Sequence, residues 1–197
     1  MTREEATAIG KKALQKSAAS AVAVGVALIS GPLFTWRHWM AGFLVGLLYA
    51  NVFEYLFHRL LLHSANDLFA PLHARHHETW GEDSEGLHVT FGDSPGSVVL
   101  LLTLNAVPFM LLEWLFSPGL GAGVVLGLVA YWICMEEIHW RRHMGGLSRF
   151  LEPCRRHHFN HHAGKGSFNL FLPLCDWLVS RFQEAAACFC LRKGKTS

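Results

Sequence analysis

The stretch WMAGFLVGLLYANVFEYLFHRLLLH, residues 39–63, decides the fold class, because an apolar run long enough to cross a membrane leads directly into two histidines. The arrangement returns in residues 120–143, LGAGVVLGLVAYWICMEEIHWRRH, where a second apolar run leads into another pair. A helix of about 20 residues crosses the hydrocarbon core of a bilayer. Histidine is costly near hydrocarbon unless something compensates it, so both pairs indicate a function at a membrane surface.

The composition of the chain also favours an integral membrane protein. Hydrophobic residues make up 51% and charged residues 16% of its 197 residues, which leave room for one domain. The net charge of +2, with no stripe of Lys and Arg interleaved with aromatic residues, argues against nucleic-acid binding. Four apolar stretches predict transmembrane helices over residues 17–35, 39–57, 97–116 and 120–135. The fourth stretch is short, and we expect its helix to continue past the bilayer to His143.

The distribution of basic residues predicts the orientation, because Lys and Arg gather on the cytosolic side of membrane proteins. If the N-terminus is cytosolic and all four stretches span, the outer loops are residues 36–38 and 117–119, which contain one basic residue, Arg37. The other sixteen of seventeen Lys and Arg then lie on the cytosolic side. We therefore expect a multi-pass protein with both termini cytosolic and with the histidines on that same side.

The predicted fold is an all-α integral membrane fold, with four transmembrane helices and a cytosolic helical cap. The predicted parts are an N-terminal cytosolic segment (1–16), a membrane domain (17–183) and a C-terminal tail (184–197). Near the end of the chain, residues 175–191 carry apolar side chains at mostly helical spacing, namely Trp177, Leu178, Phe182, Ala186 and Phe189. This segment is expected to lie against the membrane surface or to cap the site.

Ten of the thirteen histidines fall into four clusters with short, regular spacings. Imidazole is the commonest neutral metal ligand and suits iron, zinc and copper. Ten ligands exceed the roughly four to six that one such ion takes, so the count predicts two metals that share the set. A metal pair held by histidines at a membrane surface indicates oxygen chemistry on a lipid. The candidate ligands are His58, His63, His73, His76, His77, His139, His143, His158, His161 and His162.

Three clusters contain two histidines four residues apart, which face the same point from one helix. The extra histidine of each H-x-x-H-H cluster, His76 or His161, lies on the same side and can reach the same metal or its neighbour. His58 and His63 are five apart, which turns them by about 140° on an ideal helix. Either the helix unwinds there, or a π-bulge occurs, or the two serve different ions. The assignment of histidines to individual metals stays open.

Carboxylates near the clusters are candidates for supporting roles, because a ligating imidazole usually donates its other N–H to a carboxylate or carbonyl. Glu54 lies one turn before His58 in an otherwise apolar helix, and Glu136 lies one turn before His139. Glu136 is explained equally well as an interfacial carboxylate paired with an arginine. His157 extends the last cluster and is a further supporting candidate.

The ordered clusters resemble those of the fatty acid hydroxylase and sterol desaturase superfamily of membrane non-haem di-metal oxygenases. The resemblance covers roughly residues 43–183. It rests on HRLLLH (58–63), HARHH (73–77), HWRRH (139–143) and HFNHH (158–162), in that order and with similar gaps. The stretch FNLFLPLCDWL (168–178) is similar to the segment that follows the last cluster in this superfamily, and its Asp176 joins the supporting candidates.

The resemblance implies a membrane monooxygenase that uses two iron ions and O2, with zinc a possible occupant of the same positions in a crystal. It also implies hydroxylation of a lipid acyl chain or a similar long hydrophobic substrate. Electrons are expected from a separate protein, a ferredoxin or cytochrome, because the chain lacks the cytochrome domain that some fatty acid 2-hydroxylases carry. Trp80, Phe91, Phe159, Phe168 and Phe171 are expected either to line a substrate channel or to pack in the core.

Two other functions stay open at this point. One is a hydroxylase or desaturase of a carotenoid or sterol. The other is a membrane protein that binds or transports metal without catalysis. A transporter would place its ligands near the middle of the membrane, whereas these histidines follow the ends of the apolar stretches.

Overall fold

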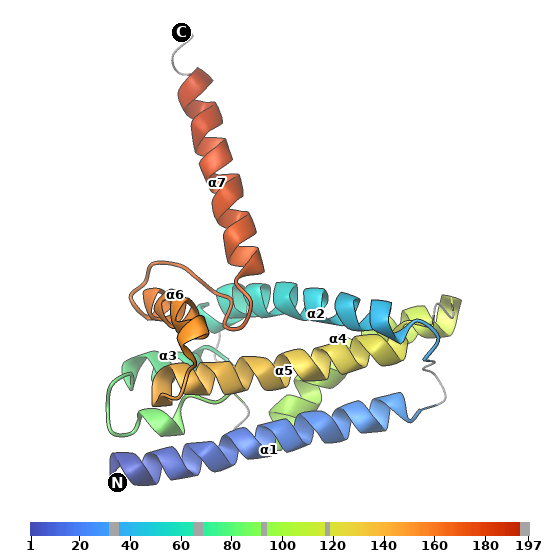
Figure 1. Cartoon of the computed structure of the whole chain (residues 1–197), viewed down its shortest axis with the longest axis horizontal. Helices are drawn as coiled ribbons and strands as arrows, with labels where there is room; N and C mark the ends of the chain where they lie inside the picture. The colour runs from blue at the N-terminus through green and yellow to red at the C-terminus, as the bar shows by residue number, and fades with distance from the viewer. Residues whose placement is uncertain (32–35, 65–68, 92–93, 117–118, 194–197) are drawn as a thin grey trace.

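The computed structural model describes residues 1–31, 36–64, 69–91, 94–116 and 119–193, and for residues 184–193 the backbone alone. Its stem consists of α1 (Arg3–Ile29), α2 (Trp39–Leu56), α4 (Pro95–Phe116) and α5 (Gly121–Met144), which run along one axis in Figure 1. The remaining helical elements are η1 (Phe57–Leu62), α3 (Ala70–Glu78), η2 (Glu85–Leu87), η3 (Arg149–Leu151), α6 (Glu152–His162) and α7 (Leu174–Lys193).

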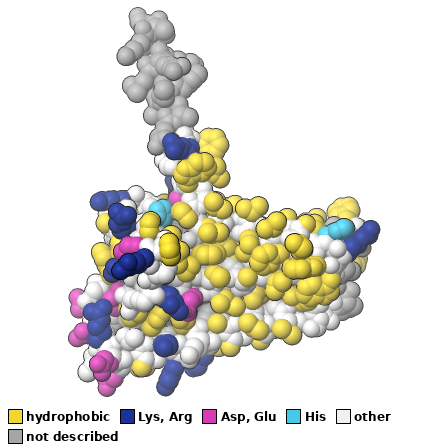
Figure 2. Space-filling view, in the orientation of Figure 1, with side chains coloured by type: hydrophobic (Ala, Val, Ile, Leu, Met, Phe, Trp, Pro, Cys, Tyr) yellow, Lys and Arg dark blue, Asp and Glu magenta, His cyan; other side chains and the backbone are white. Residues whose placement is uncertain are grey.

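The prediction of an all-α fold with four membrane-spanning helices is confirmed. Within the described residues, four helices are long and apolar enough to cross a membrane, namely Arg3–Ile29, Trp39–Leu62, Pro95–Phe116 and Gly121–Met144. Figure 2 shows hydrophobic side chains over the middle of the stem, while charged side chains gather at the end that carries the N-terminus, α3 and α6. The protein is therefore a multi-pass membrane protein. The side of the membrane that each end faces stays a prediction.

The first spanning helix begins earlier than expected. α1 starts at Arg3 and continues without a break through residue 16, where the sequence had suggested a separate segment. Thr2 caps the helix in a reciprocal pair of hydrogen bonds with Glu5, which satisfies two backbone N–H groups at its start. Its buried residues recur at helical spacing and are small except for Leu14, so the bundle covers one stripe of α1 along its whole length. The predicted end of this span, residues 32–35, lies outside the described residues.

The closest helix pair in the stem is α2 with α5, and glycines make the approach possible. A Cβ built on Gly46 would lie 2.4 Å from the Val124 carbonyl oxygen, and one on Gly127 would lie 2.5 Å from the Phe43 carbonyl oxygen. Gly42 and Gly123 meet the opposite backbone as closely. Small residues four apart let helix backbones approach in membranes, where hydrophobic burial gives no drive for association. This contact fixes the spacing between the two helices that lead into histidine clusters.

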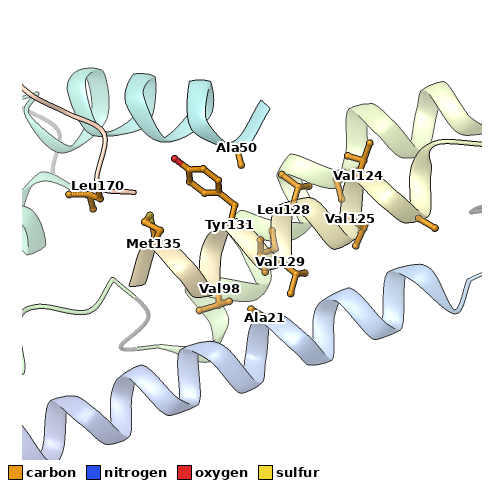
Figure 3. Packing of buried hydrophobic residues seen from close by; sticks show 13 residues of the cluster. Ala21, Ala50, Val98, Val124, Val125, Leu128, Val129, Tyr131, Met135 and Leu170 are labelled. Atoms are coloured by element: carbon orange, nitrogen blue, oxygen red, sulfur yellow. The ribbon is translucent and has the colours of Figure 1, made fainter. Parts of the chain in front are cut away.

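The apolar core follows α5 along the stem. Figure 3 shows Leu128, Tyr131 and Met135 of α5 between Ala50 of α2 and Val98 of α4, with Leu170 closing the core near the cap. At the opposite end of the stem, the buried carboxylate of Glu113 accepts hydrogen bonds from backbone N–H groups of Gly119, Leu120 and Gly121. An acidic group beside the N-terminus of α5 is favourable, so this carboxylate has a structural role.

α7 leaves the stem crosswise to the other long helices (Figure 1). It contacts α2 near its own start, and Trp177, Leu178 and Phe182 are exposed along it, as a helix on a membrane surface would require. The predicted apolar face continues to residues 186 and 189, whose side chains lie outside the described part of the chain. Placement of α7 on the membrane stays a prediction.

Candidate metal centre

The four histidine clusters meet at one end of the stem, where two of the stem helices extend beyond the others. α2 continues into η1, α5 continues to Met144 as expected, and the short helices α3 and α6 lie at this end (Figure 1). Each of the ten clustered histidine rings lies against at least one other, and the centroids of such contacting rings are 4.3–6.2 Å apart. His38, beside the start of α2, and His88, which follows η2, lie outside this set.

The ten histidines form two groups that touch each other. In each group, four histidines offer nitrogens that all lie within 4.8 Å of one another, and a fifth ring lies beside them. The ring centroids of His77 and His162 are 4.3 Å apart, which joins the groups. Group A consists of His58, His63, His73, His77 and His161, and group B of His76, His139, His143, His158 and His162.

Each H-x-x-H-H cluster supplies both groups. On α3, His73 and His77 belong to group A and the histidine between them, His76, to group B. On α6 the division is reversed, since His158 belongs to group B with His162, and His161 to group A. Of the two possibilities that the sequence left open for the extra histidine, the structure thus places it with the neighbouring group.

A π-helix resolves the five-residue spacing between His58 and His63. Residues Phe57–Leu62 form η1, in which backbone hydrogen bonds join residues five apart rather than four. That wider turn places residues five apart above each other, and the two rings stack with centroids 5.3 Å apart. Both histidines therefore enter group A, which selects the π-bulge among the three alternatives.

The Nε2 atoms inside each group face one another. His58 donates its Nδ1–H to the carbonyl oxygen of Phe168, and His143 donates its Nδ1–H to Glu85, so the Nε2 atoms of both rings carry no proton. His58 Nε2 nevertheless lies 3.1 Å from Nε2 of His73 and 3.0 Å from Nε2 of His161. An Nε2–H of one neighbouring ring can donate to such a lone pair, but the several Nε2 atoms that converge in a group cannot all be paired in this way. A cation at the centre of each group attracts all of these lone pairs.

The spacing of these nitrogens fits transition-metal ions. Within groups A and B the short Nε2–Nε2 distances range from 2.7 to 3.2 Å. Metal–imidazole bonds of about 2.0–2.1 Å at right angles put neighbouring nitrogens about 2.9 Å apart. Five neutral nitrogens per group also leave a six-coordinate ion one open position, as a reactive site requires. The residues therefore fit one metal ion in each group.

Burial keeps these imidazoles neutral, and neutral imidazole is the form that binds metals. Burial first, and the neighbouring imidazoles second, lower the pKa of His77 to about 4, that of His161 to about 3 and that of His162 to about 2. The pKa values of His76 and His158 lie well below their ordinary value for the same reasons. These ring nitrogens are thus available as ligands throughout the physiological pH range.

Glu54 supports the centre through the loop that follows α6. Its buried carboxylate accepts hydrogen bonds from the Tyr131 hydroxyl at 2.6 Å, the Asn169 side chain at 2.9 Å and the Leu170 backbone N–H at 2.8 Å. The same loop presents the Phe168 carbonyl to His58. Glu54 was predicted to accept a hydrogen bond from a clustered histidine directly. In the structure it instead holds the loop whose Phe168 carbonyl accepts the hydrogen bond from His58.

Glu85 is a residue that the sequence analysis missed. It lies on η2, is 3% exposed, and accepts the Nδ1–H of His143 at 2.7 Å. Arg3 on α1 lies 3.5 Å from the other carboxylate oxygen. No local pattern marks Glu85, because Glu78, Glu82 and Asp83 precede it in the same polar stretch and only the folded loop distinguishes it.

The other supporting candidates lie close to the centre. Glu136 is buried and accepts the backbone N–H of Phe91. Asp176 accepts the backbone N–H groups of Phe168 and Asn169, and its other contact is His157 Nε2 at 2.9 Å. Burial alone would raise the pKa of Asp176, but these hydrogen bonds outweigh it and the pKa is lowered. Asp176 therefore holds the loop after α6 at Phe168 and Asn169, and Glu54 holds the same loop at Leu170.

An apolar cavity leads from the stem to group A. Its walls come from α2, α4 and α5, and Phe57, Leu101, Tyr131 and Met135 are among them, with His58 at one end. Of the five aromatic residues suggested as channel walls, Phe91 lines this cavity. Trp80 stacks on Phe159 and lies over His162, Phe168 lies against group A, and Phe171 packs on Tyr131.

The sequence model of the fatty acid hydroxylase family matches residues 43–180, which include all ten histidines, most of α2, α3 to α6 and the start of α7. The chain belongs to this family. The family assignment confirms the resemblance found in the sequence. α1 lies outside the matched residues, so the Arg3 contact with Glu85 comes from a part of the chain that the family model does not cover.

A curated relative agrees with the family match. The chain is 24% identical over 147 residues to a protein named fatty acid 2-hydroxylase from Macaca fascicularis, which covers 68% of this chain. The chain spans only 37% of the length of that relative. No solved structure matches the chain significantly.

Proposed function

We propose that this fatty acid hydroxylase family member is a membrane oxygenase that inserts one oxygen atom into a lipid acyl chain or a similar long hydrophobic substrate. The observation that carries the proposal is the pair of adjacent histidine groups at the end of an apolar cavity. The cavity admits a hydrocarbon chain, and the donor set suits two transition metals. The name of the curated relative supports the choice of an acyl chain.

We propose iron as the metal in both groups. Two iron ions together with O2 and two external electrons supply the oxidising power that an unactivated C–H bond requires. Neutral imidazoles leave the positive charge of the ions largely uncompensated, unlike the carboxylates of other di-metal sites. The histidines hold the ions, Glu54 and Glu85 fix the orientation of the ring-bearing segments, and the apolar cavity wall excludes water from the substrate chain.

We further propose that the histidine end of the stem and both termini face the cytosol, and that a separate ferredoxin or cytochrome delivers the electrons. The distribution of Lys and Arg supports this orientation, and the N-terminus lies at the histidine end of the stem (Figure 1). Labelling of an introduced cysteine near residue 2 by a membrane-impermeant reagent tests it. Labelling of this cysteine from outside intact cells would contradict the proposed orientation.

The function is tested by mass spectrometry of lipids from cells with and without the chain. The expected product carries one additional oxygen on an acyl chain, whereas oxygen on a carotenoid or sterol would support the alternative substrate class. His139→Ala removes a member of group B and should abolish the product with membrane insertion intact. His88→Ala, outside both groups, is the matched control and should retain it.

Metal analysis separates an oxygenase from a protein that binds metal without catalysis. Chain purified without oxygen is expected to contain two iron ions and to consume O2 when a reductant and lipid are supplied. One ion per chain, or two zinc ions with no oxygen consumption under any loading, would contradict the proposed function.

A further inference from the structure

A second, polar cleft is lined by Phe168, whose ring also lies against group A. The end of α2, the loop 165–168 and the first turns of α7 enclose it, and its volume is about 610 Å³. That volume is in the range of small-molecule sites, which runs from about 300 to 1,000 Å³. None of the roles derived above uses this cleft.

The charge in the cleft is positive. Arg59 and Lys165 line it, and among the described residues no carboxylate pairs with either side chain. Of the described residues in the lining, Asp176 alone is acidic. Its carboxylate already accepts two backbone N–H groups and contacts His157, so those donors offset its charge.

Arg59 is held in place although it is exposed. Its Nη1 donates to the Tyr55 hydroxyl, and its guanidinium carbon lies 5.7 Å from the Tyr55 ring centroid and 5.6 Å from the Phe168 ring centroid. A guanidinium fixed between two rings loses little freedom when it binds an oxyanion with its planar fork. The arrangement is therefore prepared for a carboxylate or phosphate group.

The position of the cleft indicates a ligand with an apolar chain. Arg59 lies on η1, at the end of the spanning segment Trp39–Leu62, so the cleft opens at the level where head groups of a bilayer lie. Phe168, Pro173 and Trp177 provide apolar walls beside the charges. A soluble anion would need the charges alone, whereas these walls suit the first carbons of a chain.

We propose that this cleft binds the oxyanion head group, carboxylate or phosphate, of an amphiphile, with Arg59 and Lys165 as its counter-ions. The inference rests on the function proposed above and deepens it, because the amphiphile is the lipid to be oxidised. The Phe168 ring centroid lies 5.6–5.8 Å from those of His58, His63 and His161. A head group in the cleft therefore leaves the carbons nearest to it beside group A.

The test measures binding rather than turnover. Full-length chain in a neutral detergent is incubated with radiolabelled palmitate, and unlabelled hexadecyl phosphate, hexadecanol or inorganic phosphate competes. Palmitate and hexadecyl phosphate are expected to bind at least tenfold more tightly than hexadecanol, as a charge-assisted hydrogen bond implies. Hexadecanol that competes equally well would overturn the proposal. Inorganic phosphate that competes as well as hexadecyl phosphate would show a site for free oxyanions and would also overturn it.

Variants locate the binding in the cleft. Arg59→Gln is expected to weaken palmitate binding about tenfold and Lys165→Gln by a smaller factor, with hexadecanol binding unchanged. Arg149→Gln, which removes an exposed positive charge from η3, is the matched control and should bind as the parent chain does. Unchanged palmitate binding in both cleft variants would refute the assignment.

Two controls keep the interpretation separate from the metal centre and from turnover. Because Arg59 adjoins His58, the metal content of each variant is measured. If Arg59→Gln loses metal, the palmitate affinity of Lys165→Gln decides the test instead. A chain that binds palmitate through Arg59 but oxidises no lipid would refute the proposed function and leave the cleft assignment standing. A chain that oxidises lipid but shows no preference for charged head groups would refute the cleft assignment and leave the proposed function standing.

Discussion

A metal-binding histidine is oriented by the partner of its second nitrogen, and for His143, one of the proposed ligands, that partner is the buried carboxylate of Glu85. Glu85→Gln keeps the size of the side chain but removes its charge, so Nδ1–H of His143 loses its strongest acceptor. We expect the metal affinity of group B to fall by about 10- to 100-fold, the usual effect of removing such a partner. Competition with a chelator, read out as metal content per chain, measures the change.

Glu82→Gln provides the control for this prediction, because Glu82 is an exposed acid three residues earlier in the same loop. Its affinity should equal that of the parent chain. If Glu85→Gln also leaves the affinity unchanged, Glu85 serves only to tie η2 to Arg3.

At the same scale, the sequence predicted which histidines gather but not how they divide. Imidazoles four apart on a helix share a face in any fold, so the clusters alone suffice to predict convergence. The assignment of His76 to group B and His161 to group A depends on how α3 and α6 are placed against each other, which no local spacing contains. Glu85 escaped prediction for the same reason, since its partner lies 58 residues away.

At the scale of the elements, the contact between α2 and α5 determines whether both helices present their histidines at the right separation. Gly127→Ala places a methyl group where the Phe43 carbonyl oxygen would be 2.5 Å away, so the helices must separate. We expect a loss of about 1–3 kcal/mol in stability, the usual cost of overpacking, together with reduced metal content. Thermal unfolding in detergent and metal analysis measure the two effects.

Gly96→Ala on α4 controls for the intrinsic effect of the substitution. Its Cβ would meet the Ser94 hydroxyl at 3.4 Å, an ordinary contact, and alanine favours a helix over glycine by up to about 1 kcal/mol, less in a first turn such as this one. The control should therefore keep or raise the unfolding temperature. An equal rise for Gly127→Ala would show that the α2–α5 contact tolerates a larger separation.

The apolar stretches were sufficient to predict the spanning helices, because length and hydropathy are properties of the segment itself. The start of α1 was not predictable in this way. Residues 3–16 carry charges and few large apolar side chains, and their partner is the η2 loop, where a Cβ on Gly10 would meet the Gly86 carbonyl oxygen at 1.8 Å. Small residues become informative only once the surface that they approach is known.

At the scale of the whole molecule, the proposed metal centre joins segments that are far apart in the chain. Histidines of η1, α3, α5 and α6 converge through Nε2 atoms 2.7–3.2 Å apart, a donor set that can hold ions. An ion that binds only the folded state stabilises it by about 2.7 kcal/mol at a concentration one hundred times its dissociation constant. The metals should therefore stabilise the cap and stem together.

Removal of the metals by a chelator is accordingly expected to lower the unfolding temperature of the chain in detergent, and iron or zinc should restore it. The double variant His139→Ala, His158→Ala retains group A and should show a smaller difference between the loaded and stripped states. His88→Ala should show the full difference, because it leaves both groups intact. If stripped and loaded chains unfold at the same temperature, the nitrogens do not converge on ions in the folded protein, and the two-metal interpretation of the site fails.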